Sequence, residues 1–474
     1  MIKPTIEEID VPFSNVRLFD ILKNEPYLFF LDSSCDHEKL GRFSFLGCDP
    51  FLIFRSKRDF ITLEWAGGNT ENLRSDPFIA LKKIFKIYEL EECANIPFAS
   101  GAVGYLAYDL KDHIEDLPDL AIDDLGLPDS ILGFYDVVII CDNLKEKTYI
   151  ASSGMPETDI AKNGYRKEAR LKEFKDKLSG ACERYRRKTV SFAPPALRSN
   201  FSRPEYANAI NKAKAYIKKG DIYQVNLSQR FEAKVDVDAH ELYLKLREAS
   251  PAPFSSYLGF KEIAVLSSSP ERFLRKDGDR IETRPIKGTR PRGEDASSDA
   301  LLEKELSQSG KDRAEHIMIV DLERNDLGRI CEYGSVRVAE SFIIEKYANV
   351  FHLVSTVTGL LKNNIDPIDC LKASFPGGSI TGAPKVRSME IIEELEPVKR
   401  SVYTGAVGYI SFDGRMDTSI VIRTFIMKGN DIYFQVGGGI VADSTAEEEY
   451  QETLDKAQGL FKALGITFDS KVTV

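Results

Sequence analysis

SPERFLRKDGDRIETRPIKGTRPRG, residues 269–293, is the stretch of this 474-residue chain that says most about its fold. Asp277-Gly278 is a two-residue hairpin signal, so the flanking residues are expected to pair as antiparallel strands, with Glu271 opposite Arg284. Lys287 follows three residues later, roughly 10 Å along a strand. The sequence therefore predicts a carboxyl group and an amine at the open end of one hairpin.

This pairing suggests acid and nucleophile chemistry. A lysine amine is nucleophilic only when unprotonated, which burial or nearby cations such as Arg284, Arg290 and Arg292 would favour. A buried carboxyl group that keeps its proton can act as a general acid. The alternative from spacing alone is a surface lysine and a salt-bridged glutamate.

Composition is typical of a soluble globular protein, with 43% hydrophobic and 29% charged residues. The formal net charge of −10 argues against nucleic acid as a partner. The seven cysteines are scattered without a C-x-x-C pair, which favours a reducing cytoplasm over a disulfide framework or a zinc site. The first residues, MIKPTIEEIDVPF, predict neither secretion nor membrane insertion.

The chain divides into two sequence regions. Residues 1–190 are rich in strand-like runs, with one amphipathic helix near 77–90 and an exposed helix within 156–188. Residues 200–466 alternate helices and strands, beginning with a helix at 203–219 that Gly220 ends. Residues 101–109 and 405–413 share the pattern GAVGY, so the two regions are expected to contribute matching strands to one core, although chance similarity is an alternative.

Two predicted helices carry acidic groups. In the helix at 444–464, Glu449, Glu452 and Lys456 fall on one face. In the segment at 311–328, Asp312 and Glu315 share a face. If Glu315 and Glu452 converge, they form a site of hard oxygens suited to Mg²⁺ that retains several waters, whereas a solvated acidic face is the alternative.

Three further features could bind an anion or the substrate. The loop FPGGSITGAPKV, residues 375–386, runs into a helix start, but its glycine spacing does not match a phosphate-binding P-loop. Arg423 lies in an apolar strand expected at 418–427, where a guanidinium needs an anionic partner. His352 lies in another apolar run, where a hydrogen-bonded core imidazole is the alternative to a catalytic group.

Five of these stretches, in this order, resemble the signatures of the chorismate-utilising enzymes: SPERF, PIKGTRPRG, DLERNDLGR, GGSITGAPK and GAVGY. The resemblance covers residues 200–466. It implies an α+β fold of the anthranilate synthase component I type, in which two large antiparallel sheets pack face to face with helices outside.

Within the family, the chain most resembles the component I subunits of aminodeoxychorismate synthases, which make 4-amino-4-deoxychorismate for 4-aminobenzoate and folate. The discriminating residue is Lys287, because the otherwise similar anthranilate synthases carry alanine in this motif. Isochorismate and salicylate synthases use a water-activating lysine where this chain has Gln224. Ammonia is then expected from a separate glutamine amidotransferase subunit in a heterodimer.

The resemblance also implies a role for each candidate site residue. The catalytic residues would be Lys287, Glu271 and His352, and the Mg²⁺ ligands and their supporting residues would be Glu315, Glu452, Asp312 and Glu449. The substrate would contact Gly288, Thr289, Ser379, Tyr403, Arg423, Gly437, Gly438, Gly439 and Lys456.

A second ligand site is implied near the N-terminus. Residues resembling the walls of the tryptophan pocket of relatives are Ser33, Leu40, Gly41, Arg42, Phe43, Pro253, Phe254 and Ser255. The usual glutamate of that pocket is Asp32 here, so a vestigial core is the alternative. Two rival functions also remain from the sequence: an anthranilate synthase component I, and a non-catalytic regulator that binds tryptophan or an aromatic acid.

Overall fold

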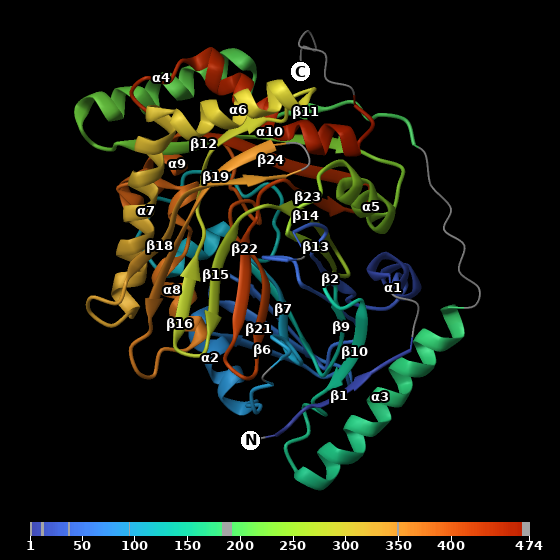
Figure 1. Ribbon diagram of the computed structural model, residues 1–474. Coiled ribbons are helices and arrows are strands. Elements are labelled where there is room, and N and C mark those ends of the chain that lie inside the picture. Colours follow the sequence, from blue (N-terminus) through green and yellow to red (C-terminus); the bar gives the residue numbers. More distant parts are fainter. Residues whose placement is uncertain are drawn as a thin grey trace.

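The computed structural model describes residues 2–10, 14–36, 38–93, 95–182, 192–347 and 350–466. The described strands form two large antiparallel sheets, shown in Figure 1, which we name sheet I and sheet II. Sheet I runs in the order β1 (Thr5–Glu8), β10 (Lys147–Ser152), β9 (Val137–Asp142), β3 (Phe43–Gly47), β2 (Phe29–Asp32), β13 (Phe254–Gly259), β14 (Ala264–Ser269), β23 (Thr424–Lys428), β24 (Asp431–Ile440), β12 (Gln224–Lys234) and β11 (Arg198–Ser199), with β20 (Gly382–Ala383) paired to β12. Sheet II runs in the order β17 (Ile286–Pro291), β19 (Val350–Leu360), β16 (Arg280–Thr283), β15 (Arg272–Asp277), β22 (Met416–Ile420), β21 (Ala406–Ser411), β7 (Gly101–Leu106), β8 (Ser130–Tyr135), β4 (Leu52–Lys57), β5 (Phe60–Trp65) and β6 (Thr70–Arg74), with β18 (Arg337–Lys346) paired to β19.

The two sheets pack face to face, and helices cover their outer faces. One apolar core contains side chains from both sheets, including Phe29 and Val138 from sheet I and Tyr105 and Val407 from sheet II. A second core joins sheet I to α1 (Asn15–Leu22), α3 (Ile160–Cys182), α4 (Arg203–Lys219), α5 (Ala239–Ala249) and α10 (Ala446–Ala463). A third core joins sheet II to α2 (Pro77–Ile87), α7 (Gly310–Ile330), α8 (Pro367–Ser374) and the 3-10 helix η1 (Tyr108–His113). The predicted fold class is confirmed.

Helices α6 and α9 complete the outer layers. Helix α6 (Ala296–Gln308) places Leu306 against Phe351 and Leu353 of β19. Helix α9 (Lys385–Leu395) contributes to the cores of both outer layers. None of the described helices is long and apolar enough to cross a membrane.

Each sheet consists of one block of strands from before residue 190 and one block from after it, and the two blocks meet at a single strand pair. In sheet I, β2 pairs with β13, and in sheet II, β7 pairs with β21. The second pair joins the two GAVGY segments directly, with Gly104 opposite Gly408. A Cβ at either glycine would lie within 2.1 Å of a backbone oxygen of the neighbouring strand, so both positions need glycine. The predicted boundary near 190 falls partly outside the described residues, which resume at 192.

The predicted capping of α4 is confirmed, but the hairpin register was wrong by two residues. Ser202 and Glu205 form a capping box, and Gly220 ends the helix with φ +83°. In the β15–β16 hairpin, Asp277 pairs with Arg280, so the turn is Gly278-Asp279 rather than Asp277-Gly278. Gly278 takes φ +59°, as the first residue of such a turn requires. Glu271 is consequently beside Ile286 and not Arg284.

The strand predicted at 418–427 is also interrupted. Strand β22 ends at Ile420 in sheet II, and β23 begins at Thr424 in sheet I, so the chain crosses between the sheets at this point. Arg423 lies at the crossing with φ +52°, a left-handed conformation that is uncommon for a residue with a Cβ. Apolar composition alone could not reveal this break, because both flanking segments are buried strands.

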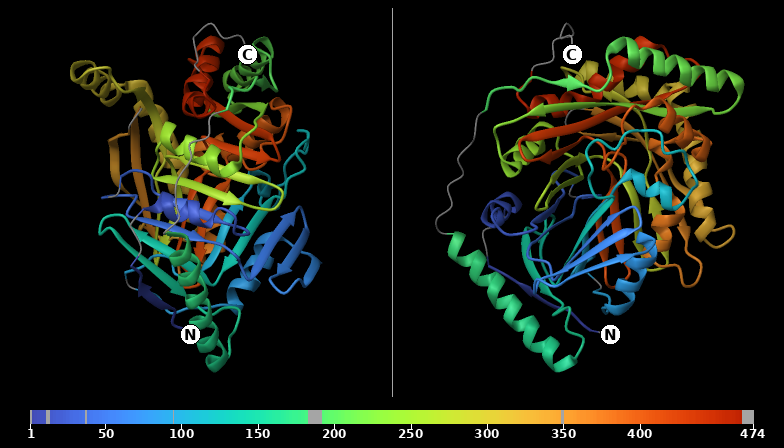
Figure 2. Two further views of the ribbon diagram at one scale, coloured as in Figure 1. Left: turned by 90° about the vertical axis from the view of Figure 1, so that its right-hand side faces the viewer. Right: turned by 180° about the vertical axis from the view of Figure 1, so that it is seen from behind.

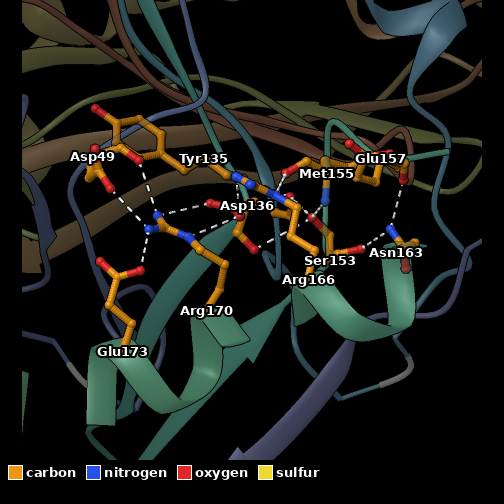
Figure 3. Close-up of polar contacts among 11 residues, drawn as sticks. Asp49, Tyr135, Asp136, Ser153, Met155, Glu157, Asn163, Arg166, Arg170 and Glu173 are labelled. Atoms are coloured by element: carbon orange, nitrogen blue, oxygen red, sulfur yellow. Dashed lines mark hydrogen bonds and ion pairs between the residues drawn. The ribbon is translucent and has the colours of Figure 1, made fainter. Parts of the chain in front are cut away.

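Helix α3 packs along the outside of the N-terminal strands of sheet I, as Figure 2 shows. Figure 3 shows the polar contacts that hold it there. The carboxylate of Asp136, which is 1% exposed, accepts hydrogen bonds from Arg166 and Arg170 of α3. Arg170 also pairs with Asp49 and with Glu173. A buried anion is thus matched by two guanidinium groups.

Replacing Asp136 with alanine is expected to lower the free energy of unfolding by about 3 kcal/mol, because it leaves two cations without their buried partner. Urea denaturation measures this loss. The matched control is Glu173→Ala, which removes a 40% exposed partner of the same Arg170 and should cost less than about 1 kcal/mol. Equal losses in both variants would contradict the prediction.

Candidate active site

A cavity of ≈ 1490 Å³ lies where β17, α7, α10 and the crossing before β23 meet. The SPERF and PIKGTRPRG motifs both contribute residues to its lining, and so do the acidic helices α7 and α10. The predicted residues that line it are Glu271, Lys287, Gly288, Thr289, Asp312, Glu315, His352, Ser379, Tyr403, Arg423, Gly437, Gly439, Glu449, Glu452 and Lys456. Gly438 is not among the lining residues, but it is close to two of them. A Cβ at Gly438 would be 3.0 Å from Glu449 Oε2 and 3.3 Å from Glu452 Oε1. Residues far apart in the sequence thus converge on one site.

The pKa of the Lys287 amine is lowered. Within the described part of the chain it has no carboxylate partner at salt-bridge distance. Burial lowers the pKa of Lys287 most, and the positive charge of Lys456 lowers it further. The carboxylates of Glu315, Glu452 and Glu271 oppose this shift without reversing it. A lysine with a lowered pKa is the form suited to nucleophilic attack.

Glu271 has the opposite shift. It lies just before β15, is 5% exposed, and its Oε1 accepts a hydrogen bond from Ile286 N at 3.3 Å. Burial raises its pKa to about 6, while a hydrogen bond from the Ser379 side chain and the charge of Lys287 act against this rise. An acid with a raised pKa beside an amine with a lowered pKa is the arrangement expected of an acid and nucleophile pair.

The His352 imidazole is neutral and forms hydrogen bonds with the side chains of Thr289 and Arg423. Its Nε2 is 3.2 Å from Arg423 Nη2 and its Nδ1 is 2.9 Å from Thr289 Oγ1. A guanidinium can only donate, so Nε2 accepts and Nδ1 carries the proton that is donated to Thr289. Burial and the nearby Arg423 charge lower the pKa of His352. This geometry suits positioning of Arg423 better than proton transfer, and the catalytic role of His352 stays a prediction.

Arg423 presents a guanidinium without a carboxylate partner in the described residues. Its side chain reaches the cavity from the crossing between the sheets, where its left-handed backbone turns it. A guanidinium held by a neutral imidazole keeps its full positive charge for a ligand. Such a guanidinium is suited to bind a carboxylate, and this role of Arg423 stays a prediction.

The glycine run 437–439 leaves room for the side chains of Lys287, Gln224 and Lys456. It lies inside β24, opposite Ser228 to Asn226 of β12. A Cβ at Gly439 would be 3.0 Å from Lys287 Nζ and 2.6 Å from Gln224 Nε2. Lys456 donates a hydrogen bond to the Gly437 carbonyl oxygen at 3.0 Å. Glycine is needed at these positions because neighbouring side chains approach the backbone too closely for a Cβ.

Four carboxylates gather at the α7 and α10 side of the cavity. Glu315 and Glu452 are close enough that the charge of Glu452 contributes to raising the pKa of Glu315. Glu452 Oε1 is 2.6 Å from Lys456 Nζ, and Asp312 Oδ2 is 3.0 Å from Arg290. Glu449 Oε1 accepts from Ser444, whereas its buried Oε2 has no hydrogen-bond partner. An orphaned buried carboxylate oxygen is a position where a cation would be stabilised.

These donors fit Mg²⁺ that keeps part of its water shell. No group of three or more His, Cys, Asp or Glu side chains in the described ranges is arranged as a complete metal cage. Mg²⁺ is commonly held by one or two carboxylates together with waters and substrate oxygens, and does not need such a cage. Glu315 and Glu452 would be the direct ligands, with Asp312 and Glu449 in support.

None of the candidate tryptophan residues is among those that line this cavity, and the structure brings their two stretches together. Ser33 Oγ donates to the carbonyl oxygens of Phe43 and Pro253, and Ser34 bonds Ser255. A Cβ at Gly41 would be 3.0 Å from Ser33 Cβ. Leu40 and Phe254 lie in the same segments, and Arg42 is paired with Asp142. Tryptophan binding here stays a prediction.

Asp32, the residue that departs from the usual pattern, is buried and already partnered. Its carboxylate accepts hydrogen bonds from Arg247 and from the Tyr243 hydroxyl. These bonds satisfy Asp32 within the protein, so it needs no ligand to balance its charge.

One lining residue, Tyr347, was not identified from the sequence. Tyr347 lies beside His352, with ring centroids 5.6 Å apart, and its hydroxyl donates to Glu345. Gln224 is fully buried near Lys287, and neither atom of its amide has a hydrogen-bond partner. The resemblance had already singled out Gln224, which the structure places next to the cavity but not among the residues that line it.

Comparison with known proteins gives consistent matches. The family model described as chorismate binding enzyme matches residues 30–462. Aminodeoxychorismate synthase component 1 of Salmonella typhimurium is 41% identical over 463 residues, 96% of this chain and 96% of that protein. Anthranilate synthase component 1 of Aquifex aeolicus is also 41% identical, over 93% of this chain and 90% of that protein. The crystal structure of anthranilate synthase component I from Streptococcus pneumoniae superposes with a TM-score of 0.76 at 32% identity, covering 88% of this chain and 91% of that one.

Proposed function

This chain belongs to the chorismate binding enzyme family, and from that premise we propose that it is the aminodeoxychorismate synthase component I of its organism. The observation that carries the proposal is Lys287, an amine with a lowered pKa that lines the cavity. Overall identity does not decide between the two activities, because relatives of both names are 41% identical. The lysine supports amination at C4, since anthranilate synthases resemble this chain but carry alanine there.

The proposed reaction has two covalent steps. The Lys287 amine adds to ring carbon C2 of chorismate while Glu271 protonates the C4 hydroxyl, which leaves as water. Ammonia then attacks C4, the C2–N bond to Lys287 breaks, and the proton released by the new amine returns to Glu271. Two substitutions by good nucleophiles replace one difficult displacement, which is the advantage of covalent catalysis.

The remaining residues bind and orient the substrate. Arg423 and Lys456 supply positive charge for the two carboxylates, and His352 and Thr289 fix the direction of the guanidinium. When bound, Mg²⁺ would neutralise the ring carboxylate, with Glu315 and Glu452 as its ligands. Ser379 holds Glu271 through its side chain.

Ammonia is proposed to come from a separate glutamine amidotransferase subunit, and the product to enter 4-aminobenzoate and folate synthesis in the cytoplasm. The relatives are named component 1, which supports a second component. The six cysteines whose side chains are described are all free, and this suits a reducing compartment.

Product identification tests the proposal. Incubation of the purified chain with chorismate, Mg²⁺ and ammonium, followed by aminodeoxychorismate lyase, is expected to give 4-aminobenzoate. A control without the lyase should accumulate 4-amino-4-deoxychorismate only. Anthranilate as the sole product would refute the assignment in favour of anthranilate synthase, which the equal identity to relatives of that name keeps as the second candidate. Tight ligand binding without any turnover would indicate a regulator.

A further inference from the structure

The first GAVGY segment leads into helix η1, which contacts a turn that lines the cavity. Strand β7 pairs antiparallel with β21, with Leu106 opposite Ala406. The residues after β7 therefore lie beside those before β21, which form the turn 400–404. A Cβ at Gly405 would be 2.1 Å from the Leu106 carbonyl oxygen, so the two segments are in close contact. The turn residues that line the cavity are Arg400, Tyr403 and Thr404.

The turn 400–404 has two residues in a left-handed backbone conformation. Ser401 has φ +52° and Thr404 has φ +59°, although neither is glycine. Such conformations are costly for a residue with a Cβ and persist only where the surroundings hold them. Thr404 is held by a hydrogen bond from its backbone N to the Val421 carbonyl oxygen at 2.8 Å. Ser401 is held by η1.

Helix η1 binds Ser401 through two hydrogen bonds. Tyr108 N donates to the Ser401 carbonyl oxygen at 2.8 Å, and Ser401 N donates to Asp109 Oδ2 at 3.1 Å. Asp109 and Ser401 are both buried, so water cannot readily replace the carboxylate as the acceptor. The nearby cations Lys111 and Lys399 form ion pairs with other carboxylates. The Asp109 side chain is thus directed at the turn.

The Tyr403 side chain is fixed by contacts within the same turn. Its backbone N donates to the Arg400 carbonyl oxygen at 3.1 Å. The Arg400 guanidinium is 2.7 Å from Glu396 and lies over two aromatic rings, 4.9 Å from the centre of Tyr108 and 5.8 Å from that of Tyr403. A displacement of Ser401 would therefore also displace Tyr403.

We propose that Asp109 is a positioning residue for substrate binding. By accepting the hydrogen bond from Ser401 N, it keeps the turn 400–404 in the conformation that presents Tyr403 to chorismate. Asp109 itself is not among the residues that line the cavity, so it acts through the turn. The N-terminal region thereby contributes to the affinity for chorismate, although all the predicted catalytic residues follow residue 200. The inference rests on the proposed function in taking chorismate as the ligand beside Tyr403.

The separate effects on KM and kcat test this role. Asp109→Ala leaves the buried Ser401 N–H without an acceptor and is expected to raise the KM for chorismate about tenfold. The kcat should stay within about threefold of the parent value, because Lys287 and Glu271 lie outside the turn and the lost contact is one of binding. Asp109→Asn keeps an oxygen for Ser401 N, so its KM should remain near the parent value.

A double-mutant cycle separates positioning from a general loss of stability. Tyr403→Leu removes the ring but keeps apolar volume, and it is expected to raise the KM. Adding Asp109→Ala to it should raise the KM little further, because both changes act through one contact. Asp109→Ser, whose oxygen is one bond shorter than that of aspartate, takes the place of Asp109→Ala if that variant does not fold, and should give the same rise.

Asp413→Ala is the matched control, because Asp413 has the same position in the second GAVGY segment. Asp413 pairs with Arg415, and neither residue lines the cavity. The variant should leave the KM unchanged, whatever its effect on stability.

The outcomes are distinguishable. An unchanged KM in Asp109→Ala overturns the inference, and so does an equal rise in Asp109→Asn or an additive rise in the double variant. A parent enzyme that makes anthranilate refutes the proposed function and leaves this inference standing, because the readout is the affinity for chorismate. A parent enzyme that neither binds nor converts chorismate defeats both.

Discussion

Replacing Lys287 with alanine is expected to lower chorismate turnover by about 10⁴-fold or more, the scale seen when an enzyme loses its nucleophile. In the proposed reaction the Lys287 amine is the group that attacks C2, so the substitution removes the nucleophile. Steady-state kinetics with ammonium as the nitrogen source measures the loss.

The matched control is Lys276→Ala, on the adjoining hairpin. Lys276 is also largely buried, but it donates to the Gly278 carbonyl and does not line the cavity. Its removal should leave turnover per folded molecule unchanged. Loss of activity in both variants would point to damage of the hairpin instead of loss of a nucleophile.

The covalent step has its own signature. Under ammonia starvation the parent enzyme should accumulate an adduct on Lys287 with the mass of chorismate less one water. Mass spectrometry of the intact chain and of its peptides detects and locates it. A fully active Lys287→Met enzyme without any adduct in the parent would defeat the mechanism.

Replacing Glu452 with glutamine is expected to remove the response of activity to Mg²⁺ together with more than about 100-fold of turnover. Mutating a residue that only holds a metal ligand in place typically lowers metal affinity by 10- to 100-fold. Mutating a direct ligand should therefore lower the affinity by more. The carboxylate lies within the acidic cluster with Glu315 and Glu449, and its charge is compensated by Lys456 alone at contact distance among the described residues. Titration of activity and calorimetric titration with Mg²⁺ both measure the effect.

Glu447→Gln serves as the control on the same helix. Glu447 is 67% exposed and pairs with Arg203 at the surface. Its loss should leave both the Mg²⁺ affinity and kcat near the parent values. Unchanged kinetics in Glu452→Gln would remove this residue from the proposed metal site.

The sequence alone determined the features that depend on interactions between residues close together in the chain. The capping box and terminal glycine of α4 follow from neighbouring residues, and the shared face of Glu449, Glu452 and Lys456 follows from the helical period. The order of the motifs was sufficient to predict the family and the two-sheet fold. These are properties of local geometry or of whole-motif identity, so they required no knowledge of packing.

Only the tertiary structure decided which groups meet and how each side chain is directed. The observed hairpin register differs from the predicted one by two residues, because Gly278 takes the left-handed position of the turn. The tertiary structure also placed Arg423 at a crossing between sheets. The contacts between Gln224 and Gly439 and between Asp109 and Ser401 join elements distant in the sequence. Such contacts depend on long-range burial and strand pairing, which no local pattern encodes. The same burial lowers the pKa of Lys287 and raises the pKa of Glu271.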